Sequence, residues 1–286
     1  MRRWRTLMIR GLGMLAATLL AGCAIFPARQ GTDTGLSGDT IALLGEVHDN
    51  PHGHRERLDL LTRAVAAGWR PAIAMEQFDT ERQADIDRAR REAPHDVQHV
   101  IDVATPARSN WDWAQYRPVI ALALAYDLPL LAANLSGAQT TKVVRGGYAS
   151  AFGADQLAAL GLAQPIDAAW QAAQESEIDA GHCGMLPASV WPAMARAQLA
   201  RDAVMASVLR GQGANGIVLL AGNGHVRRDI GVARWLTPGE QVRVVAIGVL
   251  EFPGPNLPDA AFDAVMRVPP APRDDPCEAF VGRGKP

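Results

Sequence analysis

Short apolar runs bounded by turn-forming residues recur along most of the chain. Five of them cover residues 40–44, 71–75, 128–132, 216–221 and 241–250. Most are apolar at nearly every position, which is typical of strands buried on both faces of a parallel sheet. A shorter run at residues 266–268 precedes two prolines and predicts a late edge strand.

Helical patterns lie between these runs. Residues 55–67 have apolar side chains at helical spacing and stop at Gly68, and residues 119–126 and 193–210 are also helical in character. This alternation predicts an α/β fold with a mostly parallel central sheet and flanking helices.

Two segments, residues 80–118 and 136–214, are too long for simple connections. Both have helical patterns, and the second contains helical stretches at 154–162, 166–178 and 193–210. We therefore predict a helical insertion at about 136–214 within a domain of residues 40–286.

The first 22 residues have the pattern of a bacterial lipoprotein signal peptide. Four arginines precede an apolar run at residues 11–20, which is too short to span a bilayer, and Leu20-Ala21-Gly22-Cys23 follows. We expect cleavage before Cys23 and stable anchoring through acyl chains on its thiol; the alternative is an ordinary secretory signal with a chance cysteine. Residues 23–39 are predicted to be a flexible tether. Ala24, where Asp would favour the inner membrane, indicates the outer membrane, with the domain facing the periplasm.

The exported part of the chain is acidic. The whole chain has 28 Lys and Arg and 30 Asp and Glu, so the loss of four signal-peptide arginines leaves 24 basic residues and a net charge of −6. A net acidic domain argues against a nucleic-acid partner.

Cys183 and Cys277 remain after acylation of Cys23. Export places them where disulfides persist, and two cysteines allow a single pairing. We expect a disulfide that holds the proline-rich C-terminal tail onto the domain; the alternative is two free, buried thiols.

Polar residues that can bind ligands follow four of the predicted strands. Glu46 and His48 follow the first run, Glu76 the second, Asn134 the third and His225 the fourth. The carboxyl ends of parallel strands share one edge of the sheet, and ligands bind in the crevice there. We therefore expect these side chains to meet in space.

Glu46 and His48 are two positions apart, which places both side chains on one face of an extended backbone. A carboxylate and an imidazole in this arrangement can share a metal ion, position a water molecule or hold a ligand. Gly45, Gly222 and Gly224 would allow a close approach. The alternative is structural, because acids after strands are often helix caps.

The other histidines differ in context. We expect His52 near the site and His54 in solvent, while His95 and His99 lie on a polar helical stretch and are expected at the surface. His182, in the predicted insertion, is either a ligand carried by a lid or a structural residue.

Five motifs follow one another between residues 44 and 226. They are Leu44-Gly45-Glu46-Val47-His48-Asp49-Asn50, Ala74-Met75-Glu76-Gln77-Phe78, Trp111-Asp112-Trp113 with Tyr116, Ala132-Ala133-Asn134-Leu135, and Ala221-Gly222-Asn223-Gly224-His225-Val226. Their ordered set resembles the ChaN-type haem-binding lipoproteins, within the Tiki and TraB group of α/β proteins.

The resemblance implies a role in iron acquisition, with haem as the cofactor and a pair of stacked haems held between two subunits of a homodimer. The candidate haem contacts are His48, Tyr116, Asn134, Tyr148, His182 and His225. A tyrosine phenolate is one axial ligand of haem iron, although a tyrosine beside tryptophans is also typical of core packing.

Further residues fit the same interpretation. Lys142 and Arg145 would pair with the haem propionates, and an apolar slot would be lined by Met185, Met194, Trp170 and Trp191, unless these pack in the core. The chain has no CxxCH motif, which argues against covalent haem attachment of the c type.

The alternative is a metal-dependent hydrolase, peptidase-like or esterase-like, because related erythromycin-esterase-like proteins use similar positions. His48, His225 and one of Glu46 or Glu76 would bind a divalent metal ion, and the remaining acid would activate water. Without a metal, Glu46 and His48 would act as general bases. The HExxH motif is absent, so this would not be an ordinary zincin. A third interpretation, a non-catalytic envelope scaffold, leaves the strand-end residues unexplained, and we expect a haem-binding protein rather than an enzyme.

Overall fold

The computed structural model describes residues 35–106, 109–210, 214–254, 259–275 and 277–278. The predicted signal peptide, Cys23 and the tether as far as residue 34 lie outside the described residues.

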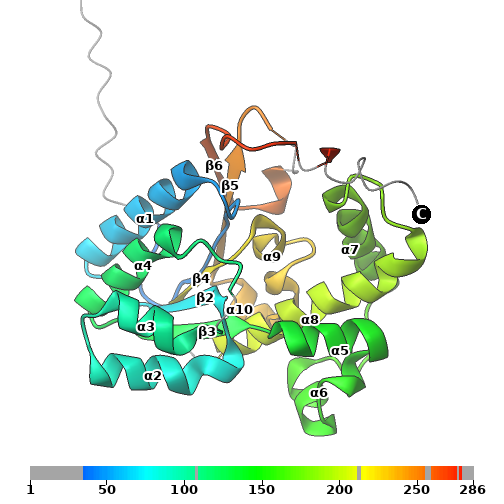
Figure 1. The fold of residues 1–286 in the computed structure, drawn as a ribbon, viewed down its shortest axis with the longest axis horizontal. Helices are drawn as coiled ribbons and strands as arrows, with labels where there is room; N and C mark the ends of the chain where they lie inside the picture. Colours follow the sequence, from blue (N-terminus) through cyan, green and yellow to red (C-terminus); the bar gives the residue numbers. More distant parts are fainter. Residues whose placement is uncertain (1–34, 107–108, 211–213, 255–258, 276, 279–286) are drawn as a thin grey trace, which may run out of the picture. The chain divides into compact units, whose positions relative to one another are not determined.

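A six-stranded sheet forms the centre of the domain (Figure 1). Its order is β3-β2-β4-β1-β5-β6, and every neighbouring pair is parallel. The strands are β1 (Ile41–Leu44), β2 (Ala72–Asp79), β3 (Leu130–Asn134), β4 (Ile217–Leu220), β5 (Val244–Glu251) and β6 (Ala264–Val268). The α/β class, the parallel sheet and the late edge strand are therefore confirmed.

The run at residues 241–250 does not begin as a strand. Gln241 ends a short helix, α10 (Pro238–Gln241), and β5 starts at Val244. Thr237 and Glu240 form a reciprocal capping box at the start of α10, a local signal that outweighs the apolar run.

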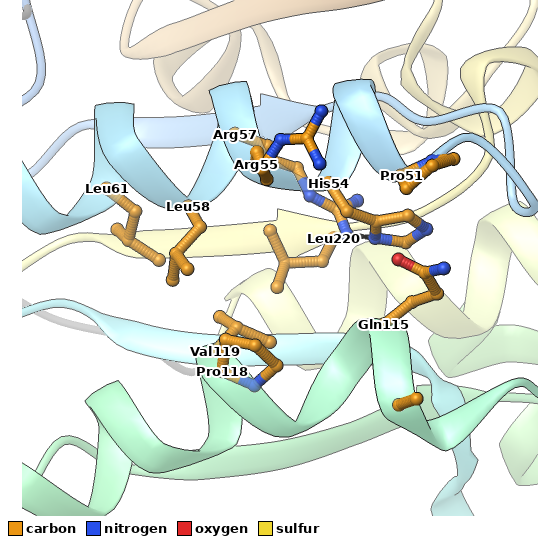
Figure 2. A pocket seen from close by; sticks show the side chains of 11 residues that line it. Pro51, His54, Arg55, Arg57, Leu58, Leu61, Gln115, Pro118, Val119 and Leu220 are labelled. Atoms are coloured by element: carbon orange, nitrogen blue, oxygen red, sulfur yellow. Dashed lines mark hydrogen bonds between the residues drawn. The ribbon is translucent and has the colours of Figure 1, made fainter. Parts of the chain in front are cut away.

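One face of the sheet is covered by the helices of the first half of the chain. Side chains of alternate strand residues, such as Ala42, Leu44, Ile73 and Met75, point to this face. They pack against α1 (Pro51–Ala66), α2 (Gln83–Glu92), α3 (Val97–Ala104) and α4 (Trp113–Ala125). A cavity of about 110 Å³ remains between α1 and α4, with Leu58, Pro118 and Leu220 in its lining (Figure 2).

Helix α1 begins earlier than the predicted residue 55. The Asn50 side chain accepts hydrogen bonds from the backbone N–H groups of His52 and Gly53, at 2.8 and 3.1 Å, and Pro51 occupies the first turn. An asparagine cap followed by proline is a strong start signal for a helix. His52 and His54 therefore lie on the helix and not in a turn before it.

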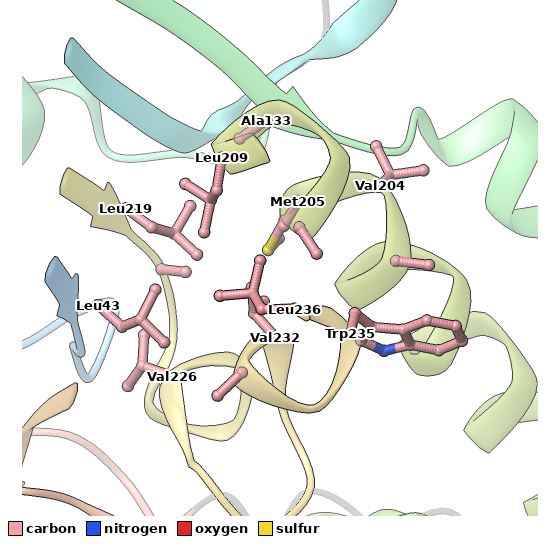
Figure 3. Close-up of a cluster of buried hydrophobic side chains, with 14 of the residues drawn as sticks. Leu43, Ala133, Val204, Met205, Leu209, Leu219, Val226, Val232, Trp235 and Leu236 are labelled. Carbon is pink, nitrogen blue, oxygen red and sulfur yellow. The ribbon is translucent and has the colours of Figure 1, made fainter. Parts of the chain in front are cut away.

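The opposite face packs mainly against α8 (Trp191–Arg210). Figure 3 shows Leu43 and Leu219 of the sheet with Met205 and Leu209 of α8, closed by Val232 and Leu236 near η4 (Val232–Trp235). Three more helices of the 136–214 segment, α5 (Gly137–Gly146), α6 (Ala154–Leu160) and α7 (Ala168–Gly181), lie beyond α8 (Figure 1). Part of this segment thus covers the sheet, and the rest extends past its edge.

The expected disulfide is present. Cys183 and Cys277 are bonded across 94 positions, with their Cα atoms 5.7 Å apart. No helix in the described part of the chain is long and apolar enough to cross a membrane.

Candidate functional site

The carboxyl ends of β1, β2 and β4 bring Glu46, His48, Glu76 and His225 together. Gly222 links two of them, because its N–H donates to Glu76 Oε2 at 2.8 Å and a Cβ added to it would lie 3.1 Å from His48 Nε2. His225 Nε2 lies 3.6 Å from Glu76 Oε1. Residues widely separated in sequence therefore form one constellation at this edge of the sheet.

A cavity of about 460 Å³ opens beside this constellation. One wall comes from the ends of β1 and β4 and includes Glu46, His48 and His225. The other wall comes from α7 and α8 and includes Ile178, His182 and Asp202. The helical segment after β3 therefore completes a hollow that the sheet edge alone does not enclose.

Glu46 is the buried anchor of the first wall, with 2% of its surface exposed. Its Oε1 accepts hydrogen bonds from His48 Nδ1 at 2.7 Å, the Tyr116 hydroxyl at 2.7 Å and Gln77 Nε2 at 3.2 Å. Its Oε2 forms a tight ion pair with the buried guanidinium of Arg57. Burial alone would raise the pKa of Glu46, but Arg57 and His48 outweigh it and lower this pKa to about 2. Glu46 is therefore a fixed negative charge.

His48 presents its ring at the surface of the cavity. Its side chain is 47% exposed, its Nδ1–H donates to Glu46, and its ring packs edge-on against Trp111 at 4.9 Å. Burial opposes the charged form, but the Glu46 hydrogen bond and the nearby Glu76 charge outweigh it and raise the pKa of His48. The other ring nitrogen, Nε2, lies on the Gly222 side, away from Glu46.

Two glycines permit the close approach of β1 and β4 at this edge. A Cβ on Gly222 would lie 3.1 Å from His48 Nε2, and a Cβ on Gly45 would lie 2.2 Å from Asn223 Oδ1. Asn223 itself exchanges two hydrogen bonds with the Val249 backbone, at 2.7 and 3.0 Å. This clamp holds the short helix α9 (Asn223–Val226), which carries His225, against β5.

His225 is held in the same way as His48, by a carboxylate on Nδ1. Its Nδ1–H donates to Asp202 at 2.6 Å, and its side chain is 11% exposed. Burial disfavours the charged form, but Asp202 and Glu76 outweigh it and raise the pKa of His225. Arg201 NH1 lies 3.7 Å from Glu76 Oε1, which places a positive charge beside the same carboxylate.

The shared geometry of the two imidazoles defines what this site can do. A carboxylate on Nδ1 fixes the tautomer and ring orientation and raises the basicity of Nε2, which is the usual arrangement of a histidine that ligates a metal or a metal-containing cofactor. His48 and His225 are therefore suited to bind such a cofactor in the cavity. No group of three or more His, Cys, Asp or Glu side chains within the described ranges is arranged to hold a metal ion by itself.

The two tyrosines named as candidate haem contacts do not line this cavity. Tyr116 is fully buried and donates to Glu46, and burial together with the Glu46 charge raises its pKa far above the usual range. Tyr148 packs against the core under α5 and α8, and burial raises its pKa to about 12. Neither hydroxyl lines the 460 Å³ cavity.

Asn134 ends β3 at the same edge but lines a neighbouring hollow of about 260 Å³ with Gln77, Asp79 and Arg201. Lys142 and Arg145 are exposed on α5. Trp170 packs on Trp235 in the core, and Met185, Met194 and Trp191 are not among the residues that line the cavity. These four residues therefore do not line the 460 Å³ cavity.

Of the remaining histidines, one lines the cavity and the others do not. His54, expected in solvent, is buried, and its Nε2 lies 2.9 Å from the His48 carbonyl oxygen, because α1 begins at Pro51 and turns this residue inward. His52 is half-buried beside Arg55, His95 is exposed, and His99 pairs with Glu92 on the surface. His182 lines the cavity at the end of α7, with Nδ1 2.7 Å from the Ile178 carbonyl oxygen.

Sequence reasoning missed three of the site's charged residues. Arg57, Arg201 and Asp202 lie inside helices, where no strand end or motif marks them. One sequence signal could have found two of them. Arg57 and Asp202 are charged residues at positions where the helical period of α1 and α8 predicts buried apolar side chains.

The family described as "Haem-binding uptake, Tiki superfamily, ChaN" matches residues 34–236. The chain belongs to this family. Among curated proteins, none matches the sequence significantly. The ChaN-type family expected from the motifs is therefore confirmed.

One solved structure supports the fold. A structure of ChaN from Campylobacter jejuni with cofacially bound haem has a TM-score of 0.56 at 18% identity, over 73% of this chain and 80% of that chain. A mutant of the erythromycin esterase EreC in its open conformation has a TM-score of 0.43 at 13% identity, over 77% of this chain and 71% of that chain. At 18% identity the likeness to the ChaN structure concerns the fold alone.

Proposed function

We propose that the chain binds haem in the 460 Å³ cavity at the carboxyl edge of its sheet and serves iron uptake. Family membership supports haem as the ligand. The observation that carries the location is the pair of imidazoles, His48 and His225, each held on Nδ1 by a carboxylate within one cavity.

These residues suit the cofactor chemically. Haem supplies an iron whose axial positions accept an imidazole nitrogen. Glu46 and Asp202 hold the two rings in place and keep Nε2 as the nitrogen available to a ligand. Val47, Ile178 and Ile230 add apolar surface to the lining, which suits a largely apolar macrocycle.

The hydrolase interpretation is not favoured. The metal-dependent form needs a metal held by His48, His225 and an acid, and no such group of ligands is formed in the described part of the chain. In the metal-free form Glu46 would act as a general base, but its pKa of about 2 makes it a weak one.

A hemin titration tests the proposal. The full chain, solubilised in detergent, should give a Soret band distinct from that of hemin with an unrelated protein of similar size. His48→Ala and His225→Ala should each weaken haem binding by about tenfold or more, because each removes a side chain that can bind the haem iron. His99→Ala, a surface histidine outside the cavity, is the matched control. If the Soret band of the wild type is the same as that of hemin with the unrelated protein, the haem proposal is wrong. If all three variants bind hemin equally well, haem does not bind in this cavity.

We also propose that Cys23 carries the lipid that anchors the protein to the outer membrane. The basic, apolar and small-residue order of residues 1–22 supports this. Replacement of Cys23 by serine should move the protein from the membrane pellet to the soluble fraction. A variant that still sediments with the membrane would contradict lipid anchoring.

We also propose that the protein forms a homodimer around this ligand site. His48 is 47% exposed, so a ligand on its free side lies near the protein surface, where a second copy can reach it. Light scattering should show the mass doubling on addition of hemin, and an unchanged mass at saturating hemin would contradict the dimer.

A further inference from the structure

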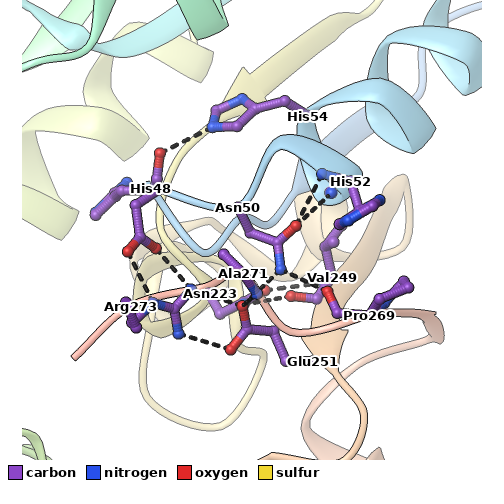
Figure 4. A network of polar contacts seen from close by, with 12 residues as sticks. His48, Asn50, His52, His54, Asn223, Val249, Glu251, Pro269, Ala271 and Arg273 are labelled. Atoms are coloured by element: carbon purple, nitrogen blue, oxygen red, sulfur yellow. Dashed lines mark hydrogen bonds and ion pairs between the residues drawn. The ribbon is translucent and has the colours of Figure 1, made fainter. Parts of the chain in front are cut away.

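The last described segment of the chain is attached to both walls of the cavity, beside His48 through Asp49 and beside His182 through Cys183. We call residues 269–275 and 277 the strap. It leaves the end of β6, where the Pro269 carbonyl oxygen accepts from Asn50 Nδ2 at 2.9 Å and the Ala271 N–H donates to Glu251 at 2.9 Å (Figure 4). At its other end Cys277 is bonded to Cys183, which follows the end of α7.

An ionic clamp holds the first half of the strap. Arg273 donates to both carboxylate oxygens of Asp49 at 2.8 Å and to both oxygens of Glu251 at 2.6 and 2.7 Å (Figure 4). These hydrogen bonds, aided by those from Ala271 and Asn50, lower the pKa of Glu251 to about 2, so the clamp persists in mild acid. Asp49 directly follows His48, which fixes the strap beside one wall of the cavity.

A disulfide holds the second half of the strap at the opposite wall. Cys277 is bonded to Cys183, and Gly181 and His182, just before Cys183, line the cavity. Cys183 has a φ of +62°, in the left-handed region that a residue with a Cβ rarely adopts. Backbone hydrogen bonds from Cys183 to Ala180 and from Gly184 to Asp179, at 3.1 and 2.9 Å, close this turn at the end of α7, and the disulfide adds a covalent restraint to it.

The body of α7 is held independently of this bond. Trp170 and Gln174 donate to the Ile230 carbonyl oxygen at 2.7 and 3.0 Å, and Glu177 pairs with Arg227 at 2.6 Å. These contacts lie in the first three turns of the helix. Loss of the disulfide should therefore free the end of α7 and the strap without releasing the whole helix.

We propose that the strap is a redox-sensitive latch on the cavity, with Cys183–Cys277 as its releasable end. A dithiol reductant attacks one sulfur, passes through a mixed disulfide and leaves as a cyclic disulfide, while Cys183 and Cys277 each take up a proton as thiols. Two electrons move from the dithiol to the protein. The release of the strap then opens the wall formed by residues 181–182 and speeds ligand exit. The ligand in this step is haem, so this part rests on the proposed function.

Haem transfer to an excess of apoglobin measures the latch directly. Dithiol reduction of the wild type should raise the dissociation rate about tenfold or more, a change well outside ordinary error. The double variant Cys183→Ser with Cys277→Ser should have the fast rate with or without dithiol. Arg273→Ala should also be faster with the disulfide intact, whereas Arg228→Ala, which removes a similar ion pair with Asp263, should keep the wild-type rate.

Hydrogen exchange of the ligand-free protein separates the latch from the haem proposal. On reduction, amides of residues 178–186 and 271–275 should lose protection, while those of residues 199–206 in α8 keep it. If the wild-type protein binds no haem but shows this exchange pattern, the proposed function is wrong, and the latch still controls access to the cavity for a different ligand. The latch is refuted if reduction leaves the haem dissociation rate unchanged. It is also refuted if reduction leaves amide protection unchanged or removes it throughout α8.

Discussion

The Glu46 carboxylate shows how much of the site depends on one buried charge. It accepts hydrogen bonds from three side chains and pairs with the guanidinium of Arg57. A charge so fully paired and hydrogen-bonded can remain ionised in the interior. Its function is to orient His48, because its hydrogen bond to Nδ1 leaves only Nε2 for a ligand.

Tyr116 tests whether a phenol or an imidazole meets the ligand. Tyr116→Phe removes a hydrogen bond to an ionised group, and the free energy of unfolding should fall by about 2 kcal/mol. Haem affinity and the Soret maximum should stay unchanged, because the Tyr116 side chain is fully buried. Urea unfolding and hemin titration measure both, and a shifted Soret band would identify Tyr116 as a ligand.

Glu46 also predicts how stability depends on pH. Its folded-state pKa of about 2 lies below the ordinary value of 4.5, so its contribution to stability is complete above pH 4.5 and is lost as the pH falls towards 2. The whole contribution is about 3 kcal/mol. Urea unfolding from pH 6 to pH 3 should show a steeper loss for wild type than for Glu46→Gln. Equal slopes would mean that Glu46 titrates normally in the fold.

At the scale of elements, the crossing of β1 and α9 depends on a missing side chain. A Cβ on Gly45 would lie 2.2 Å from Asn223 Oδ1, and Asn223 clamps α9 to β5. Gly45→Ala should displace this clamp, cost about 2 kcal/mol of unfolding free energy and shift His225. Gly137→Ala, with no atom within 4 Å of the added carbon, is the control and should stay within about 0.5 kcal/mol of wild type. Equal effects of the two substitutions would refute the role of the clamp.

Elements also explain what the sequence could reveal. The strand ends were predictable because buried parallel strands are continuous apolar runs, and the residues just after them must share an edge. Glu46, His48, Glu76 and His225 were found in this way. Arg57 and Asp202 were not, because a polar residue in a helix has many possible partners and its exposure depends on packing. His54 was misjudged for a related reason: the Asn50 cap and Pro51 move the start of α1 and so change the face on which it lies.

At the scale of the whole molecule, one covalent bond closes a long loop. Cys183 and Cys277 are 94 positions apart, and the chain-entropy model gives such a cross-link about 4–5 kcal/mol. The double serine variant should therefore melt at a lower temperature than oxidised wild type. Differential scanning calorimetry with and without dithiol provides the control, since the reductant should shift the wild type and leave the variant unchanged. If dithiol leaves the melting temperature of the wild type unchanged, the disulfide does not make this contribution to stability.

The direction of the sheet has a consequence for how the protein meets its surroundings. The first described residues lie near the amino end of β1, where Trp69 Nε1 donates to the Gly38 carbonyl oxygen at 3.0 Å. The cavity lies at the carboxyl end of the same strand. A ligand can therefore reach the cavity from the end of the sheet that faces away from the first described residues, without passing the segment that joins the domain to the amino-terminal part of the chain.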